Sequence, residues 1–134
     1  RGLGDVYKRQ VLQSFEQIGM GHTVGESLTQ KFEFIVNEKV FFTEAFRSDD
    51  RNSLKEHDFE LILQFYQDLI GRKTSRPLGE DLQFLLEMYC RGSVYMTVKW
   101  VLTGMKDSPA KMSKKLVEAM PPRLAAVFDE LKLL

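Results

Sequence analysis

The sequence predicts an all-α fold, a helical bundle of five to six helices in one domain. Apolar residues recur at intervals of three and four along most of the chain, and no stretch alternates long enough to predict a strand. Serine or threonine precedes three of these segments, as helix N-caps do. A length of 134 residues is enough for a single domain with its own core.

The first predicted helix covers residues 11–18 and ends at the glycine-rich segment that follows. A second begins after Thr23, which forms a capping box with Glu26, so that both side chains satisfy free backbone N–H groups. Its apolar pattern continues to Phe46 but loses phase near Asn37, where we expect the helix to break.

A third helix is predicted after a polar turn at residues 47–52. Ser53 and Glu56 repeat the capping-box pattern at its start. Gly71 is expected to end it, because glycine readily takes the left-handed conformation that follows many helices.

The helix predicted from Glu80 to Thr103 is apolar on two sides. A surface helix of a monomer needs one apolar face, so we expect another subunit to cover the second. Gly92 in its interior costs about 1 kcal/mol relative to alanine, which favours a close crossing of two helices there. Glu87 and Arg91 are spaced to form an ion pair. One apolar stripe contains Leu82, Leu85, Tyr89, Met96 and Trp100, and the other Phe84, Met88, Tyr95, Val98 and Leu102.

The C-terminal part of the chain predicts a helix hairpin and a further helical segment. Gly104 is expected to end the long helix, and Ser108-Pro109 to begin the next, with serine as N-cap and proline at the first position. That helix is predicted to run to Met120. Pro121-Pro122 then kinks or breaks it, and apolar residues resume at helical spacing over residues 124–131.

Composition and charge exclude several classes of function. The formal net charge is zero, whereas nucleic-acid binders carry a basic excess, so we do not expect this chain to bind DNA by itself. The single cysteine, Cys90, predicts a buried, inert thiol and a cytoplasmic location. No apolar run is long enough for a membrane span. The sequence has no phosphate-binding loop, nucleophile elbow or metal-ligand spacing, so no enzyme activity, metal or cofactor is expected.

Residues 1–10 differ in character from the rest of the sequence. The segment GLGDVYKRQ resembles the conceptual translation of sequencing-adapter read-through, and we expect a non-native leader here, with a native charged leader as the alternative. The domain is therefore predicted to span residues 11–134, and the native protein to continue upstream.

Several short motifs follow one another in a fixed order. They are Phe41-Phe42, Phe46, Asn52-Ser53-Leu54, Tyr89-Cys90-Arg91-Gly92-Ser93, Trp100, Gly104-Met105 and Ser108-Pro109. Their order and spacing, over roughly residues 25–120, resemble the C-terminal regulatory domain of TetR/AcrR-family bacterial transcription regulators. The most similar branch includes regulators of dihydroxyacetone kinase genes, which share the pattern W-(V/L)-x-x-G-M-x-x-S-P.

The resemblance implies a role in transcription regulation. In that family an N-terminal helix-turn-helix domain reads operator DNA, and the C-terminal domain binds an effector and forms a homodimer. The last two long helices of each subunit would form a dimeric four-helix bundle. In this sequence they are Glu80–Thr103 and Pro109–Met120, and an extension of the second helix to Lys132 is left open. The helix-turn-helix domain is missing from this sequence, so operator DNA is expected as a partner only of the parent protein. The direct partners expected are a second copy and a small, partly apolar effector, with no membrane.

The candidate site residues come from the apolar stripes. Each residue predicted for the ligand pocket could instead be an ordinary core residue. Trp100 is predicted for the dimer interface, and its alternative place is the effector pocket. The predicted ligand pocket consists of Phe32, Phe59, Phe65, Tyr66, Met88 and Tyr89. The predicted dimer interface consists of Gly92, Tyr95, Val98, Trp100, Leu102, Met112 and Leu116.

A different class of function stays open. The chain could be a stand-alone interaction module that binds another protein through the Glu80–Thr103 face. An enzyme acting in an aromatic-lined cavity is the third reading, and no catalytic residues support it. Formation of a dimer would favour the regulator. If the upstream part of the same gene encodes no helix-turn-helix, the interaction module is favoured.

Overall fold

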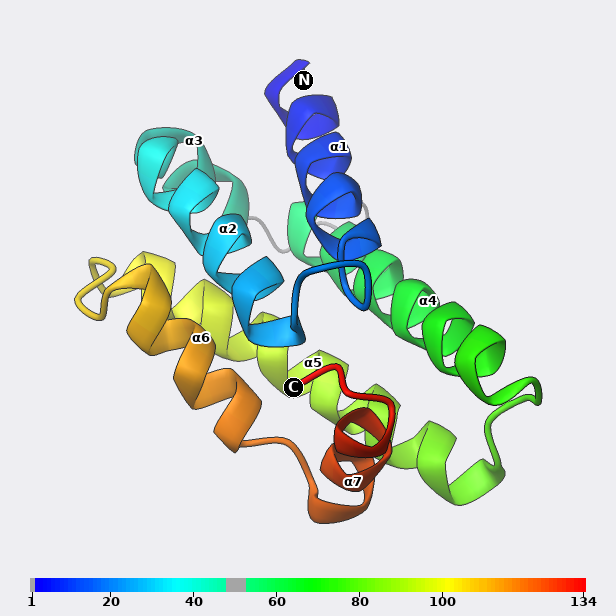
Figure 1. Cartoon of the computed structure of the whole chain (residues 1–134). Helices are drawn as coiled ribbons and strands as arrows, with labels where there is room; N and C mark the ends of the chain where they lie inside the picture. The colour runs from blue at the N-terminus through cyan, green and yellow to red at the C-terminus, as the bar shows by residue number, and fades with distance from the viewer. Residues whose placement is uncertain (1, 48–52) are drawn as a thin grey trace.

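The structure, a computed structural model, describes residues 2–47 and 53–134. The described residues form seven α-helices and no strand, which confirms the all-α class (Figure 1). The number exceeds the predicted five to six because short helices follow the breaks at Glu38 and at Pro121. Of the predicted polar turn, residues 48–52 lie outside the described part of the chain. The helices are α1 (Gly2–Glu16), α2 (Val24–Asn37), α3 (Lys39–Phe46), α4 (Leu54–Thr74), α5 (Glu80–Leu102), α6 (Pro109–Glu118) and α7 (Pro122–Glu130).

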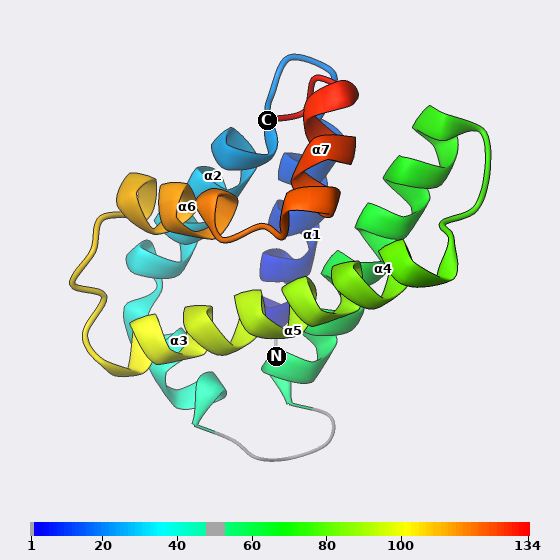
Figure 2. The same ribbon diagram turned by 90° about the horizontal axis from the view of Figure 1, so that it is seen from below.

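The long helix α5 organises the domain. It lies against α4, α3 and α7, while α1 and α6 both pack on α2. Seen from below, α5 crosses the front of the molecule from one side to the other (Figure 2). The core between the helices is rich in aromatic side chains, and its largest fully buried rings are Tyr7, Phe15, Phe32, Phe42, Phe46 and Phe128.

The two predicted capping boxes have different outcomes. At α2 the box is confirmed: the Glu26 N–H donates to Thr23 Oγ1 at 3.2 Å and the Thr23 N–H donates to Glu26 Oε1 at 2.8 Å. At α4 the prediction is wrong, since Ser53 accepts no cap hydrogen bond there. The Glu56 carboxylate instead accepts a hydrogen bond from the Arg91 guanidinium of α5 at 3.1 Å, because a cationic partner on the neighbouring helix is within its reach.

The end of α4 lies beyond the predicted stop at Gly71. The helix continues to Thr74 and ends at Ser75, which has a left-handed φ of 60°. The Thr74 hydroxyl donates to the Ile70 carbonyl at 2.7 Å and contacts the Arg76 carbonyl at 3.1 Å. The contact with Ile70 satisfies a carbonyl group near the helix end. The helix stops where Ser75, and not a glycine, takes the left-handed conformation.

α6 is slightly shorter than predicted, and a separate helix follows it. α6 ends at Glu118, before Met120, and Pro122 begins a separate helix at its first turn. An unbroken helix to Lys132 is therefore wrong, because proline cannot donate the hydrogen bond that continuation requires. α7 folds back over the core and buries Leu124 and Phe128.

Residues 2–10 form the first part of α1. The ring of Tyr7 is buried, and its hydroxyl donates to Asp58 Oδ1 at 2.9 Å. A non-native origin of this segment stays a prediction. Within the described ranges, no helix combines the length and apolar content that crossing a membrane requires.

Candidate functional site

Helix α5 has a buried inner face and an exposed apolar outer face. The inner face packs Leu86, Cys90 and Val101 into the core. On the outer face Phe84 is 64% exposed, Met88 61% and Tyr95 67%, and Met96 and Leu102 are also exposed. A surface helix in water normally presents charged or polar groups on this side. The outer face of α5, defined by these five residues, is therefore an apolar surface that the described residues leave uncovered.

A small cavity lies in the core between five helices. Its volume is about 10 Å³, which is room for about one water molecule. Three of the predicted pocket residues line it: Phe32 from α2, Tyr66 from α4 and Tyr89 from α5. The rest of its lining is Phe15, Leu28, Lys31, Ile62, Ser93, Thr97 and Leu116.

The other three predicted pocket residues lie elsewhere. Phe59 is buried, and the Arg91 guanidinium carbon lies 3.6 Å from its ring centroid in a cation–π contact. Phe65 is half-buried beside an open surface groove. Met88 is on the outer face of α5, so it does not reach the core cavity.

The two tyrosines at the core cavity differ in their hydrogen bonds. The Tyr89 hydroxyl donates to the Leu116 carbonyl of α6 at 2.5 Å. The Tyr66 side chain is buried, and its hydroxyl makes no hydrogen bond to any described residue. Burial raises the pKa of both phenols well above the usual value, so each remains a protonated donor near neutral pH. Tyr66 thus offers a hydrogen-bond donor beside the cavity.

A buried ion pair borders this cavity and was missed by the sequence reasoning. Lys31 Nζ donates to both carboxylate oxygens of Asp58, at 3.0 and 3.1 Å, and both side chains are buried. A signal was available, since Lys31 stands on the stripe of Leu28 and Ile35, and Asp58 stands four residues before Ile62.

A surface groove of about 360 Å³ separates α5 from α6. Trp100, Met112 and Leu116 line it and are buried within the subunit. These three residues were predicted for the dimer interface, but little of their side-chain surface is exposed for contact with another molecule. The exposed rim contains Met96, Lys99, Thr103, Lys106 and Lys115. Of the other predicted interface residues, Gly92, Tyr95 and Leu102 are exposed and Val98 is half-buried.

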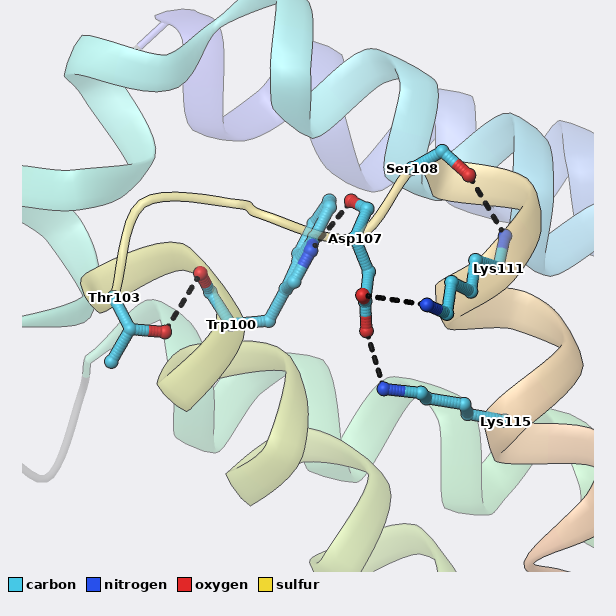
Figure 3. Close-up of polar contacts among 6 residues, drawn as sticks. All are labelled: Trp100, Thr103, Asp107, Ser108, Lys111 and Lys115. Atoms are coloured by element: carbon cyan, nitrogen blue, oxygen red, sulfur yellow. Dashed lines mark hydrogen bonds and ion pairs between the residues drawn. The ribbon is translucent and has the colours of Figure 1, made fainter.

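A network of polar contacts holds the turn between α5 and α6 (Figure 3). The carboxylate of Asp107 accepts from Lys115 Nζ at 2.6 Å and lies 3.6 Å from Lys111 Nζ. The hydrogen bond from Lys115 is the main reason why the pKa of Asp107 lies below its usual value. The Ser108 hydroxyl accepts from the Lys111 N–H at 3.2 Å, which confirms the predicted N-cap.

The ion pair predicted between Glu87 and Arg91 does not form. Arg91 reaches Glu56 on α4, and Glu87 has no ion-pair partner among the described residues. Gly92 lies next to Arg91 on the exposed side of α5, and a Cβ added there would meet no atom within 4 Å. The fold of one subunit therefore does not require a glycine at this position.

Comparison with known proteins identifies the family. A family model of TetR type, described as a transcriptional regulator C-terminal region, matches residues 22–121. No curated protein and no solved structure gives a significant match to the chain. The matched range contains the Thr23 capping box, the core cavity helices α2, α4, α5 and α6, and the α5–α6 hairpin. The chain therefore belongs to the family of C-terminal regions of TetR-type transcriptional regulators.

Proposed function

We propose that this domain binds a small effector in its core, forms a homodimer through the outer face of α5, and thereby controls a DNA-binding domain outside this sequence. The observation that carries the proposal is the exposed apolar outer face of α5. Family membership adds the role in transcription regulation. A cytoplasmic location and operator DNA as a partner of the whole protein are part of the same proposal.

The argument for a homodimer starts from the cost of exposed apolar surface. Phe84, Met88 and Tyr95 each leave most of their side chain in water. Large contiguous apolar patches on soluble domains usually mark interaction sites. A twofold dimer would cover the patch of each copy with the patch of the other, which is the commonest arrangement of homo-oligomers.

The argument for an effector site starts from the core cavity. Its aromatic lining and the unpaired Tyr66 hydroxyl combine apolar surface with a directed hydrogen-bond donor, as ligand sites do. The adjacent Lys31 and Asp58 neutralise each other, so a neutral ligand with an acceptor oxygen fits better than an ion. At about 10 Å³ the cavity is closed, and binding requires the surrounding helices to separate.

This requirement connects binding to regulation. A ligand that separates α4 from α5 favours an open form of the domain over the closed one. Such a ligand shifts the equilibrium only by its difference in affinity for the two forms. Because α5 also carries the outer face, opening the core would change the geometry of the dimer.

The experiment that tests the proposal compares two glutamate variants by sedimentation velocity. Tyr95→Glu places a charge in the outer face of α5 and is expected to yield monomers at micromolar concentration. Val40→Glu on α3 is the control, because Val40 is 81% exposed and lies outside the outer face. Dissociation by both variants or by neither would contradict the proposed interface. A wild-type monomer would favour the alternative, an interaction module whose outer face binds a different protein.

A further inference from the structure

We propose that the domain contains a second ligand site, a cage for a para-substituted phenol, which the side chain of Tyr7 fills in this structure. The cage is defined by Lys31 and Phe34 of α2, Phe42 of α3 and Asp58 of α4. Lys31 also borders the core cavity, but the other three residues do not line it, so the inference goes beyond the proposed effector site. Tyr7 acts as a tethered occupant of the cage.

The ring of Tyr7 contacts two phenylalanine rings of the cage. Its centroid is 4.9 Å from that of Phe42 in an edge-to-face contact, and 6.0 Å from that of Phe34 in a stacked contact. Both arrangements are among those that aromatic pairs prefer. Tyr7 is 1% exposed, so the surrounding helices enclose the whole ring. The space that they form is therefore shaped for a flat aromatic ring.

A buried carboxylate forms the end of the cage that binds the hydroxyl group. The Tyr7 hydroxyl donates to Asp58 Oδ1 at 2.9 Å, and Lys31 Nζ donates to the same oxygen at 3.0 Å. In this ion pair the carboxylate accepts hydrogen bonds and donates none, so it selects a ligand with a donor.

The donor must be a neutral phenol. Burial, and after it the negative charge of Asp58, raise the pKa of the Tyr7 phenol well above its usual value. The same two causes exclude a phenolate from the cage. A hydrocarbon ring fits the aromatic walls but leaves Asp58 without the hydrogen bond that Tyr7 now supplies. The cage therefore distinguishes a phenol from both.

The cage and its occupant come from different parts of the chain. The four cage residues lie within residues 22–121, the range that the TetR-type family model matches. Tyr7 lies outside that range, in the segment predicted to be a non-native leader. Without Tyr7 the cage would combine apolar aromatic walls with one directed polar group, as small-molecule sites do.

A surface cleft between α1 and α4 leads to the cage. Its volume is about 590 Å³, within the usual range of small-molecule pockets. Tyr7 and Asp58, although buried, both line this cleft, together with Leu61 and Gln64 of α4. A free phenol that enters through the cleft therefore competes with Tyr7 for Asp58. Its para substituent takes the direction in which the Tyr7 side chain joins α1.

Replacement of Tyr7 by alanine tests the cage. Tyr7→Ala removes the tethered phenol, and p-cresol is the matching free ligand, because it has the ring, hydroxyl and para carbon of the lost side chain. Toluene has the same shape without the hydroxyl. In isothermal titration calorimetry, we expect p-cresol to bind Tyr7→Ala at least about tenfold more tightly than toluene, because only p-cresol donates to Asp58. Equal affinity of the two, or no binding of p-cresol, would overturn the proposal.

A second buried tyrosine provides the matched control. Tyr66→Ala also removes a phenol ring, one that contacts Phe15 and Phe128. The Tyr66 hydroxyl has no hydrogen-bond partner among the described residues, so we expect this variant to bind toluene at least as tightly as p-cresol. If Tyr66→Ala preferred p-cresol as strongly as Tyr7→Ala does, the preference would not come from Asp58, and the cage would be refuted.

Nuclear Overhauser effects locate the ligand. We expect cross-peaks between the ring protons of p-cresol and those of Phe34 and Phe42 in Tyr7→Ala. Cross-peaks to Phe15 instead would place p-cresol at the core cavity, which Phe15 lines. That result would support the proposed effector site and overturn the cage, so the failure of one is distinguishable from the failure of the other.

The same comparison covers a loss of folding. A ligand that binds only the folded state shifts the folding equilibrium toward that state. If Tyr7→Ala is unfolded in buffer, p-cresol is expected to restore the helical circular-dichroism signal, and toluene at the same concentration is not. Restoration by both compounds or by neither would overturn the proposal.

Discussion

The indole N–H of Trp100 donates a hydrogen bond to the backbone carbonyl of Asp107 at 3.0 Å, across the turn between α5 and α6 (Figure 3). The bond fixes the last turn of α5 to the residue before the N-cap of α6. Between them the chain forms a Schellman motif, with the Met105 N–H bonded to the Trp100 carbonyl and the Gly104 N–H to the Val101 carbonyl. The motif of Trp100, Gly104-Met105 and Ser108-Pro109 is therefore one structural device that closes the hairpin and shapes the α5–α6 groove.

Gly104 is expected to be intolerant of a side chain. Its φ of +101° is a conformation that L-residues rarely adopt. We expect Gly104→Ala to lower the free energy of unfolding by about 1–2 kcal/mol in urea denaturation. Gly79→Ala is the control, because Gly79 has a φ of −68° and a Cβ there would meet no atom within 4 Å. Equal stability of the two variants would show that the turn does not depend on Gly104.

The buried pair of Lys31 and Asp58 is expected to matter most when one partner is removed. Asp58→Ala leaves the Lys31 ammonium buried without a counter-charge and should cost about 3–5 kcal/mol of unfolding free energy. The double variant Lys31→Met with Asp58→Leu removes both charges and should recover part of that loss, because the Tyr7 hydroxyl still lacks its acceptor. Urea denaturation measures both values. A cost of Asp58→Ala below about 1 kcal/mol would mean that water reaches the pair.

Tyr66 and Tyr89 are expected to respond differently to loss of the hydroxyl. Tyr89→Phe leaves the Leu116 carbonyl without its partner and should cost about 1–2 kcal/mol. Tyr66→Phe breaks no hydrogen bond to a described residue and should change stability by less than about 0.5 kcal/mol. A thermal-unfolding comparison decides between them. A large cost of Tyr66→Phe would show that its hydroxyl is already used within the fold and is not available to an effector.

Cys90 is expected to be unreactive in the folded domain. The side chain is fully buried, and burial raises the pKa of its thiol to about 12. At about pH 8 the thiol is therefore protonated, and the protonated form is not nucleophilic. We expect no reaction with a disulfide reagent in buffer and full reaction in denaturant. Rapid labelling in buffer would mean that α5 opens readily from the core.

The helix positions could be read from the sequence where the signals are local. Thr23 with Glu26, Gly104, and Ser108-Pro109 act within one turn of the chain, and the structure confirms each of them. Predictions failed where a distant residue decides. Glu56 does not form the predicted capping box with Ser53. Its carboxylate binds Arg91 instead, thirty-five positions further along the chain. The pairing of Lys31 with Asp58 joins two helices in the same way.

The site residues show the limit of apolar stripes as evidence. An apolar stripe predicts that the side chains of Trp100 and Tyr95 are both covered. It does not tell whether another helix of the same chain or a second molecule covers them. In the structure Trp100 is buried beneath the α5–α6 groove, whereas Tyr95 is exposed on the outer face of α5. Likewise Phe32 and Met88 share apolar character, yet only Phe32 reaches the core cavity. Which neighbour covers a side chain depends on helix packing, and periodicity within one helix does not contain that information.

The mass of the wild-type domain in solution tests the central claim most directly. Size-exclusion chromatography with light scattering, at micromolar concentration and moderate salt, is expected to give twice the chain mass of 15.5 kDa. A single species at the chain mass itself would mean that water covers Phe84, Met88 and Tyr95 in the native state. That result would contradict the proposed homodimer through the outer face of α5.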